Sequence, residues 1–349
     1  MAHTHKQAFA DDPETKSNPL EVLSGELDDD MRKVNALILA NMQSDVPLIP
    51  QLAGYLIASG GKRIRPLLTL ACTSIFKADM ARAHRLAAAV EFIHTATLLH
   101  DDVVDESDQR RGKDAANIVF GNQASVLVGD FLFSKSFQLM VADGNLDILR
   151  ILSDASATIA QGEVKQLSTK GNINASMSDY IEVISSKTAA LFAAACEVGP
   201  VIADQDKAVQ QAFHQYGLNL GIAFQIADDV LDYNADRTKL GKTIGDDFRE
   251  GKMTAPVLIA IENANEEEMN FWQRVMADNK QTDQDLDKAI SILNSHNALE
   301  RGLQMALDYG VRATAALSSH KSSMELQSET DVLTTALYDL VCFSIHRGH

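Results

Sequence analysis

Long stretches without glycine or proline constrain this chain more than any other feature of its sequence. Residues 80–106 contain neither, and as one helix they would be about 40 Å long. Alternation of apolar and polar residues, the pattern of a β-strand, is absent from the sequence. Similar helical segments are expected at 65–76, 122–141, 145–168, 177–198, 205–234, 252–263, 267–277, 283–294, 297–318 and 325–345. The sequence therefore predicts an all-α protein.

The connections between these segments are short. Glycine and proline mark breaks at 60–61, 112, 121, 171, 199–200 and 241–251. None of them is long enough to link two domains, so residues 26–349 are predicted to form a single domain. Residues 1–25 are polar and contain two prolines, which predicts a loose N-terminal arm.

Charge and cysteine content exclude several classes of protein. The chain has 31 Lys and Arg against 48 Asp and Glu, a formal charge of −17. Nucleic-acid binders need basic residues to neutralise phosphates, so that class is excluded, whereas a local basic pocket for a small anion is compatible. The three cysteines are scattered, which indicates buried thiols in a reducing compartment. With no secretion signal and no apolar run of about 18 residues, a cytoplasmic protein without a transmembrane segment is expected.

An acidic motif occurs twice in the chain. The sequence DDVVD at 101–105 is matched by DDVLD at 228–232. On a helix, the first and last aspartates of each motif lie one turn apart on one face. A lone motif of this kind is usually a solvated helix face, but both copies follow apolar runs. Like charges at this spacing also destabilise a helix unless cations compensate them.

The type of cation follows from the donors. Carboxylates without His or Cys partners favour hard ions, and Mg²⁺ prefers a few carboxylates together with phosphate oxygens. His100 adjoins the first motif, but one helical step turns it about 100° away from Asp101. We therefore interpret His100 as a packed or hydrogen-bonded residue. The two motifs predict Mg²⁺ that bridges to a polyphosphate.

Basic residues gather around the two acidic motifs. The sequence GGKRIRP at 60–66 opens a helix, an Arg-Arg pair at 110–111 follows the first motif, and lysines within 239–252 follow the second. Helix N-termini and basic side chains are suited to binding phosphate. Each of these basic residues, taken alone, would be interpreted as a surface residue that keeps the protein soluble. Arg63 and Lys239 keep that interpretation. Together they predict a polyphosphate substrate.

Seven motifs in a fixed order extend this pattern over most of the chain. They are GGKRIRP (60–66), LLHDDVVDESDQRRG (98–112), GNQASVLVGDFLF (121–133), GEVKQL (162–167), KTAALF (187–192), FQIADDVLDY (224–233) and LGKTIGDDFREGK (240–252). With them the chain resembles the trans-isoprenyl diphosphate synthases, in their long-chain, octaprenyl-type branch, from about residue 28 to 346. The resemblance implies the isoprenoid synthase fold, in which long antiparallel helices surround a deep cavity. It also implies head-to-tail condensation of an allylic diphosphate with isopentenyl diphosphate.

The resemblance assigns the residues around the allylic diphosphate. The Mg²⁺ ligands, for about three ions, would be Asp101, Asp105 and Asp228. The residues acting through waters or behind these ligands would be Asp102, Asp229 and Asp232. The cations on the diphosphate would be Arg110, Lys187, Lys242 and Lys252. Oxygen dipoles near the developing carbocation would come from Thr188 and Gln225.

The resemblance also assigns the second substrate. Isopentenyl diphosphate would be bound without a bridging metal by Lys62, Arg65, His94 and Arg111. No side chain is an obvious base for the final proton loss, and the released diphosphate is the expected acceptor. Relatives of this family are homodimers, so a homodimer is expected, with transient membrane contact when the product leaves.

Side chains before the first motif predict the product length. Ile93, Ala96 and Thr97 would line the tunnel for the growing chain, where short-chain relatives carry bulky aromatic residues. Phe131 and Phe133 would form a lower floor or belong to the ordinary core. Small side chains predict a deep tunnel and an all-trans product of about 40 carbons (C40). Farnesyl diphosphate is the expected primer and a quinone side chain the expected use.

Three alternatives stay open. The first is a shorter-chain synthase with a product of about 15 to 20 carbons (C15–C20). The second is a terpene cyclase, against which Lys62, Arg65 and Arg111 argue, because cyclases bind no second diphosphate. The third is a non-catalytic subunit of a heteromeric synthase. Such subunits lose aspartates from the acidic motifs, whereas this chain keeps all six.

Overall fold

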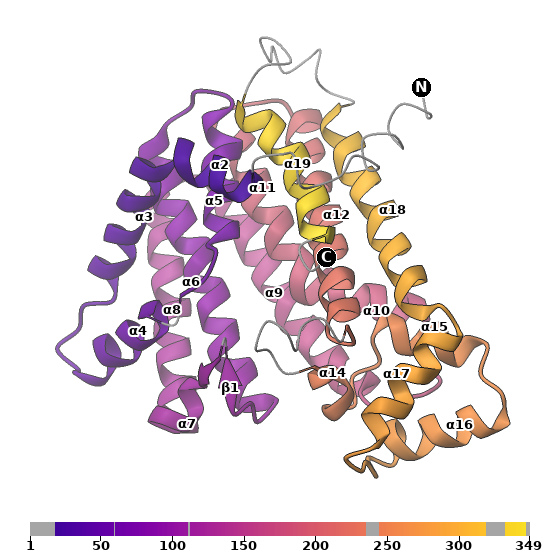
Figure 1. Ribbon diagram of the computed structural model, residues 1–349. Helices are drawn as coiled ribbons and strands as arrows, with labels where there is room; N and C mark the ends of the chain where they lie inside the picture. Colours follow the sequence, from indigo (N-terminus) through magenta and orange to yellow (C-terminus); the bar gives the residue numbers. More distant parts are fainter. Residues whose placement is uncertain (1–17, 59, 111, 235–243, 319–331, 347–349) are drawn as a thin grey trace.

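The computed structural model describes residues 18–58, 60–110, 112–234, 244–318 and 332–346. In these ranges the regular secondary structure is helical apart from one minimal hairpin, which confirms the all-α prediction (Figure 1). The first part of the chain forms α2 (Pro19–Glu26), α3 (Asp28–Asn41), α4 (Leu48–Ala58), α5 (Ile64–Ser74), α6 (Met80–Val104), α7 (Ala116–Phe120) and α8 (Asn122–Asp143). The central part forms α9 (Leu146–Thr169), α10 (Met177–Ile184), the π-helical turn η2 (Ser185–Ala189), α11 (Ala190–Ile202) and α12 (Lys207–Leu231). The last part forms α14 (Asp246–Arg249), α15 (Ala255–Glu262), α16 (Glu266–Trp272), the π-helical turn η3 (Gln273–Ala277), α17 (Asp285–Ser295), α18 (Ala298–Ser318) and α19 (Val332–His346).

The long helices α6 and α12 form the framework of the bundle. Each begins at an aspartate that caps it: Asp79 accepts hydrogen bonds from two backbone N–H groups in the first turn of α6, and Asp206 accepts one from the backbone N–H of Val209 in α12. α6 packs most extensively against α8, and α12 packs most extensively against α18 and α11. Each helix buries residues along most of its length, and this packing holds the end opposite the cap in place.

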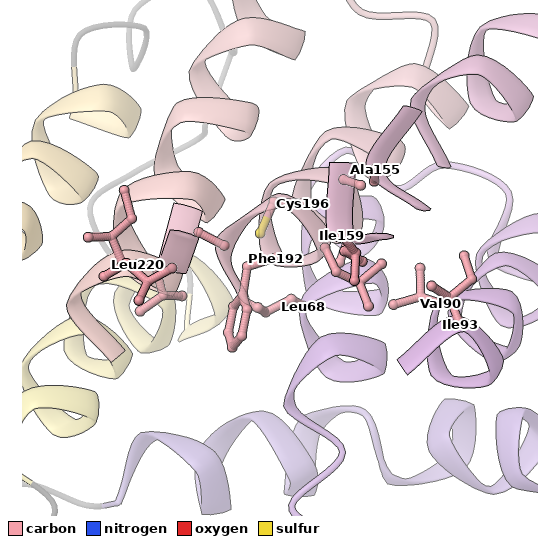
Figure 2. Close-up of a cluster of buried hydrophobic side chains, with 14 of the residues drawn as sticks. Leu68, Val90, Ile93, Ala155, Ile159, Phe192, Cys196 and Leu220 are labelled. Atoms are coloured by element: carbon pink, nitrogen blue, oxygen red, sulfur yellow. The ribbon is translucent and has the colours of Figure 1, made fainter. Parts of the chain in front are cut away.

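One hydrophobic core extends from Leu20 to Ile345. Part of it is drawn in Figure 2, where Phe192 and Cys196 of α11 lie among apolar side chains from several helices, including Ile159 of α9 and Ile93 of α6. This continuity supports the single domain expected for residues 26–349, which stays a prediction.

The prediction of a helix break at residues 199–200 is wrong. Pro200 lies inside α11, which continues to Ile202. The ring removes only one intrahelical hydrogen bond this close to the helix end. Packing explains the glycine before it, since a Cβ on Gly199 would lie 2.5 Å from the backbone carbon of Cys72 on α5. The glycine therefore permits a close approach of two helices and does not end one.

Two further local predictions need correction. Part of the arm expected to be loose, from residue 19 onward, forms α2 and buries Leu20 and Leu23; residues 1–17 lie outside the described residues. The absence of strands is also not complete, because Gln109–Arg110 (β1) and Lys113–Asp114 (β2) form an antiparallel pair. A two-residue strand is too short to show an alternating pattern, so sequence periodicity cannot detect it.

Helix α8 combines a packed face with an exposed apolar face. By length and composition alone it could span a membrane, although such a helix is weak evidence for a membrane protein. It packs along α6, and a Cβ on Gly129 would lie 2.3 Å from Nε2 of His100. On its other side Leu127 and Val141 are exposed.

Candidate active site

The two acidic motifs occupy equivalent positions at the ends of two long helices. Asp101 and Asp102 lie in the last turn of α6, which ends at Val104. Asp228 and Asp229 lie in the last turn of α12, which ends at Leu231. A helix C-terminus is the negative end of the helix dipole, so carboxylates there are destabilising unless cations lie close by. Both helix ends therefore require positive charge.

A cavity of about 840 Å³, including the part open to solvent, borders both motifs. Asp105 from the first motif and Asp229 from the second line it, together with Lys187 and Lys252. Its remaining polar lining residues include Gln166, Lys170, Tyr180, Thr188, Gln225, Asp247 and Thr254. Residues more than a hundred positions apart in the chain thus meet at one cavity.

Lys187 compensates the first motif. Its Nζ lies 3.7 Å from Oδ2 of Asp101 and donates a hydrogen bond of 2.8 Å to Oε2 of Glu163 on α9. Lys187 belongs to the π-helical turn η2, a local widening of the helix that often marks functional sites. Burial raises the pKa of Asp101 to about 7, although Lys187 opposes this shift. Lys187 therefore does not fully offset the cost of burying this carboxylate.

Asp102 forms an ion pair with Arg110. Its Oδ1 accepts hydrogen bonds from Nε and Nη2 of Arg110, at 2.7 and 2.6 Å. The Asp102 side chain is almost fully buried, and its backbone carbonyl accepts a hydrogen bond from the side chain of Asn117. Arg110 is part of β1, so this ion pair attaches the hairpin to the end of α6.

The second motif is held by a chain of side-chain hydrogen bonds. Gln225 donates from Nε2 to Oδ1 of Asp229 at 2.7 Å, and its Oε1 accepts from the hydroxyl of Thr188 at 2.9 Å. The hydroxyl of Tyr180 on α10 donates to Oδ2 of Asp229 at 2.6 Å. Burial raises the pKa of Asp229 to about 7 in spite of these hydrogen bonds, which act in the opposite direction.

Lys252 lies between the first motif and the segment that follows the second. Its Nζ lies 3.8 Å from Oδ2 of Asp105, 3.7 Å from Oδ1 of Asp247 and 2.5 Å from Oε2 of Glu250. Burial would lower the pKa of Lys252, but these carboxylates outweigh it and the pKa is raised. Asp232 has a structural contact in addition, because its Oδ2 accepts a hydrogen bond of 3.0 Å from the backbone N–H of Asp247 at the start of α14.

The residues expected to bind the second substrate partly come together. Nη1 of Arg65 lies 3.2 Å from Nε2 of His94, and the guanidinium group lies 4.4 Å from the centre of the Phe192 ring. Nζ of Lys62 lies 5.4 Å from the centre of the Phe343 ring on α19. A second cavity of about 530 Å³ is lined by His94, Arg110 and Gly60, among others.

Arg63 is not the surface residue that its sequence context indicates. Nη1 of Arg63 lies 2.6 Å from Oε1 of Glu91 on α6, and both side chains are mostly buried. Arg63 also has a positive φ of 49°, in the left-handed region that non-glycine residues rarely adopt. This largely buried ion pair therefore holds the start of α5 against Glu91, which lies one helical turn before His94 on α6.

Other predicted site residues divide into three groups. Lys242 and Arg111 lie outside the residues whose side chains the structure describes. Ile93 and Ala96 are fully buried in the core, and the partly buried Thr97 donates a hydrogen bond to the carbonyl of His94. The partly buried side chains Phe131 and Phe133 pack against the core. The tunnel lining formed by these residues stays a prediction.

His100 lies against α8, with Nε2 3.2 Å from the carbonyl oxygen of Val126, as expected for a packed histidine.

The donors at the main cavity are suited to a hard divalent cation. Its lining includes carboxylate oxygens and no His or Cys, a donor set that Mg²⁺ accepts. Burial is the main cause that raises the pKa values of Asp101 and Asp229, so a cation beside these carboxylates would stabilise their ionised form. Within the described ranges no three His, Cys, Asp or Glu side chains form a preassembled metal centre. Ligation by Asp101, Asp105 and Asp228 stays a prediction.

Sequence reasoning missed three residues at this site. Glu163 pairs with Lys187, and Asp247 lies beside Lys252. Glu163 belongs to the motif GEVKQL and Asp247 to the motif LGKTIGDDFREGK. The acidic residues of these motifs could have been tested as partners of the two lysines. No sequence motif indicates Tyr180, because a tyrosine on an amphipathic helix is normally predicted to be a core residue. Only the packing of α10 against α12 reveals its contact with Asp229.

Comparisons with known proteins agree with this geometry. Residues 46–293 match the family model "Polyprenyl synthetase". The octaprenyl diphosphate synthase of Haemophilus influenzae is 41% identical over 322 residues, which cover 92% of this chain and 95% of that protein. The crystal structure of a decaprenyl diphosphate synthase from Rhodobacter capsulatus superposes with a TM-score of 0.88 at 45% identity, covering 95% of this chain and 99% of that one. A polyprenyl synthase from Caulobacter crescentus, complexed with calcium and isoprenyl diphosphate, gives a TM-score of 0.89 at 48% identity, covering 96% and 99%.

Proposed function

The chain belongs to the polyprenyl synthetase family, and from this premise we propose that the cavity between the ends of α6 and α12 holds the allylic diphosphate. The protein is a prenyltransferase of the long-chain trans-polyprenyl diphosphate synthase type, with the isoprenoid synthase fold. One observation carries the proposal: both acidic motifs border a single cavity, together with Lys187 and Lys252. Ionising an allylic C–O bond leaves a diphosphate anion, which needs concentrated positive charge.

Mg²⁺ is the proposed cofactor, with about three ions bound beside the allylic diphosphate. Asp101, Asp105 and Asp228 would hold it, and when bound it would neutralise the departing diphosphate. The calcium in the Caulobacter relative supports a divalent cation. Lys187 and Lys252 would supply further positive charge to the leaving group, and Lys242 and Arg110 are proposed for the same task. Thr188 and Gln225 would direct oxygen atoms toward the carbocation.

Isopentenyl diphosphate is proposed to bind beside Lys62, Arg65, His94 and Arg111. The contact of Arg65 with His94 supports this proposal, because it brings two of the four side chains together. The double bond of isopentenyl diphosphate would attack the allylic carbon, and the released diphosphate would accept the proton that the product loses. Water must be excluded, because it would capture the carbocation.

The product is proposed to contain about 40 carbons (C40), built from farnesyl diphosphate and used for a quinone side chain. The octaprenyl relatives support this length. Small side chains at Ala96 and Thr97 support a tunnel for the growing chain. A cytoplasmic location is proposed, with transient membrane contact for product release.

A homodimer is proposed, formed through α8 and α9. Exposed apolar side chains on these two helices support it, because a monomer gains nothing from keeping them in water. The residues concerned are Leu127, Val141 and Val164.

One experiment tests the proposed function. The protein is incubated with farnesyl diphosphate, isopentenyl diphosphate and Mg²⁺, and the dephosphorylated products are weighed by mass spectrometry. A ladder ending near C40, about 40 carbons, is expected. A product that stops at C15–C20, about 15 to 20 carbons, indicates a short-chain synthase. Consumption of farnesyl diphosphate alone indicates a terpene cyclase, and no turnover indicates a non-catalytic subunit.

A further inference from the structure

Four side chains on the wall of the main cavity form one continuous chain of hydrogen bonds. The hydroxyl of Thr188 donates to Oε1 of Gln225 at 2.9 Å, and Nε2 of Gln225 donates to Oδ1 of Asp229 at 2.7 Å. The second carboxylate oxygen of Asp229 accepts from the hydroxyl of Tyr180 at 2.6 Å. All four residues line the same cavity. The chain therefore runs from Tyr180 on α10 to Thr188 in the π-helical turn.

The order of protons in this chain follows from the chemistry of its members. The amide NH₂ of Gln225 faces Asp229, an orientation that suits an ionised carboxylate, which only accepts hydrogen bonds. Its carbonyl oxygen then faces Thr188, whose single hydroxyl proton is used in donating to it. The lone pairs of the Thr188 oxygen are left for the cavity. If the Gln225 amide were flipped, the Thr188 oxygen would accept a hydrogen bond from the Gln225 NH₂. The hydroxyl proton of Thr188 would then point toward the cavity.

The orientation of Asp229 controls the whole chain, and two donors hold it. Gln225 lies on the same helix as Asp229, whereas Tyr180 comes from another helix and is itself buried. Hydrogen bonds to a charged group in a buried site are stronger than ordinary ones. Without the Tyr180 hydroxyl the carboxylate would keep only its intrahelical donor and could rotate about its χ2 bond.

We propose that Tyr180 is a positioning residue for the condensation reaction. Its hydroxyl orients Asp229, which through Gln225 presents the oxygen of Thr188 to the carbon that becomes positive. The proposal rests on the proposed function, which supplies the carbocation. It adds a residue from α10 that no motif in the sequence indicates. Tyr180 itself is not required to touch either substrate.

The test compares two buried tyrosines. Tyr180→Phe removes the hydroxyl that donates to Asp229. Tyr216→Phe is the matched control, because the buried Tyr216 hydroxyl donates a hydrogen bond of 2.7 Å to the carbonyl of Leu337, away from the cavity. We expect Tyr180→Phe to lower kcat about tenfold and leave the KM for isopentenyl diphosphate within about twofold, since one charge-assisted hydrogen bond is lost. Tyr216→Phe should change kcat less than about twofold.

A double-mutant cycle separates positioning from a general structural role. In the background of Thr188→Val, Tyr180→Phe should lower kcat less than about threefold, because the end of the chain is already lost. A kcat of Tyr180→Phe equal to that of Tyr216→Phe would overturn the inference. So would a full tenfold loss in the Thr188→Val background. A wild-type protein that makes no product would instead overturn the proposed function.

Circular dichroism sets the assay temperature, at which both phenylalanine variants are folded. Replacing Tyr180 by 4-aminophenylalanine keeps an N–H donor at the same place on the ring, and kcat should return to within about threefold of wild type. This replacement also decides the question if Tyr180→Phe does not fold. A tenfold loss in kcat with the donor retained would contradict the inference.

Discussion

Nζ of Lys187 lies 3.7 Å from Oδ2 of Asp101, so the π-helical turn before α11 delivers a cation to the last turn of α6. The same nitrogen donates to Glu163, and one lysine is thus shared between two carboxylates. Lys252 lies near three carboxylates, of which Asp105 belongs to the same motif as Asp101. The acidic helix ends therefore have more negative charge than the neighbouring lysines supply, which is the condition under which divalent cations bind.

Removing either acidic helix end should abolish most activity. Asp101→Ala and Asp228→Ala are each expected to lower turnover at least about a hundredfold, because charge stabilisation of the leaving group is the main catalytic contribution. Condensation of radiolabelled isopentenyl diphosphate onto farnesyl diphosphate measures this, and circular dichroism checks folding. Asp154→Ala, on the exposed face of α9, is the control. Equal turnover in all three variants would show that the motifs are not the site.

Lys62→Ala should act on the second substrate. The KM for isopentenyl diphosphate is expected to rise about tenfold with kcat within about threefold, because the lysine contacts this substrate before and during reaction. Initial rates at saturating farnesyl diphosphate give both constants. Lys288→Ala is a matched control, since Nζ of Lys288 also lies over an aromatic ring, 5.2 Å from the centre of Phe271. A KM that is unchanged in Lys62→Ala would remove this residue from the substrate site.

The Arg63–Glu91 pair should contribute strongly to stability. Arg63→Ala removes a largely buried ion pair with Glu91, and the free energy of unfolding should fall by about 3 kcal/mol. Arg150→Ala breaks an exposed ion pair with Asp147 and should cost less than about 1 kcal/mol. Urea unfolding followed by circular dichroism measures both. A similar loss in the two variants would contradict the buried role of Arg63.

Ala96→Phe should shorten the product. The large ring would close the predicted tunnel, so that chains of about 15 to 20 carbons replace the longer product. Because Ala96 is fully buried, overpacking should also lower the free energy of unfolding by about 1–3 kcal/mol. Chromatography of the dephosphorylated products reads the chain length. An unchanged long product from a folded variant would show that the tunnel does not pass Ala96.

The Arg274–Asp285 pair should make stability depend on pH. The Arg274 guanidinium, with the Thr282 backbone and hydroxyl, holds the pKa of Asp285 below its usual value. A lowered folded-state pKa stabilises the protein above the unfolded pKa of about 4, and this contribution is lost as the pH falls below it. Asp285→Asn should therefore lower Tm at pH 7 and differ progressively less from wild type in acid. Thermal unfolding across this pH range tests it; a constant difference in Tm would contradict the assignment.

The fold was largely readable from the sequence because helices are local structures. The segment 80–106 became α6 (Met80–Val104), and 205–234 became α12 (Lys207–Leu231). Residue spacing and caps determine such helices within a few turns of chain. Pro200 was misread for the opposite reason, since the contact of Gly199 with α5 lies in the tertiary packing. The hairpin at 109–114 was missed because its strands are too short to show a period.

The sequence by itself determined the two acidic motifs, the basic residues around them and the helical periodicity that carries them. The tertiary structure decided which partner each charge takes: Lys187 lies between Glu163 and Asp101, Arg110 pairs with Asp102, and Tyr180 donates to Asp229. Arg63 changed from an expected surface charge into a largely buried ion pair. The physical reason is range. Helix formation depends on neighbours a few residues apart, whereas the partner of a side chain depends on which distant helix end packing brings within hydrogen-bonding distance.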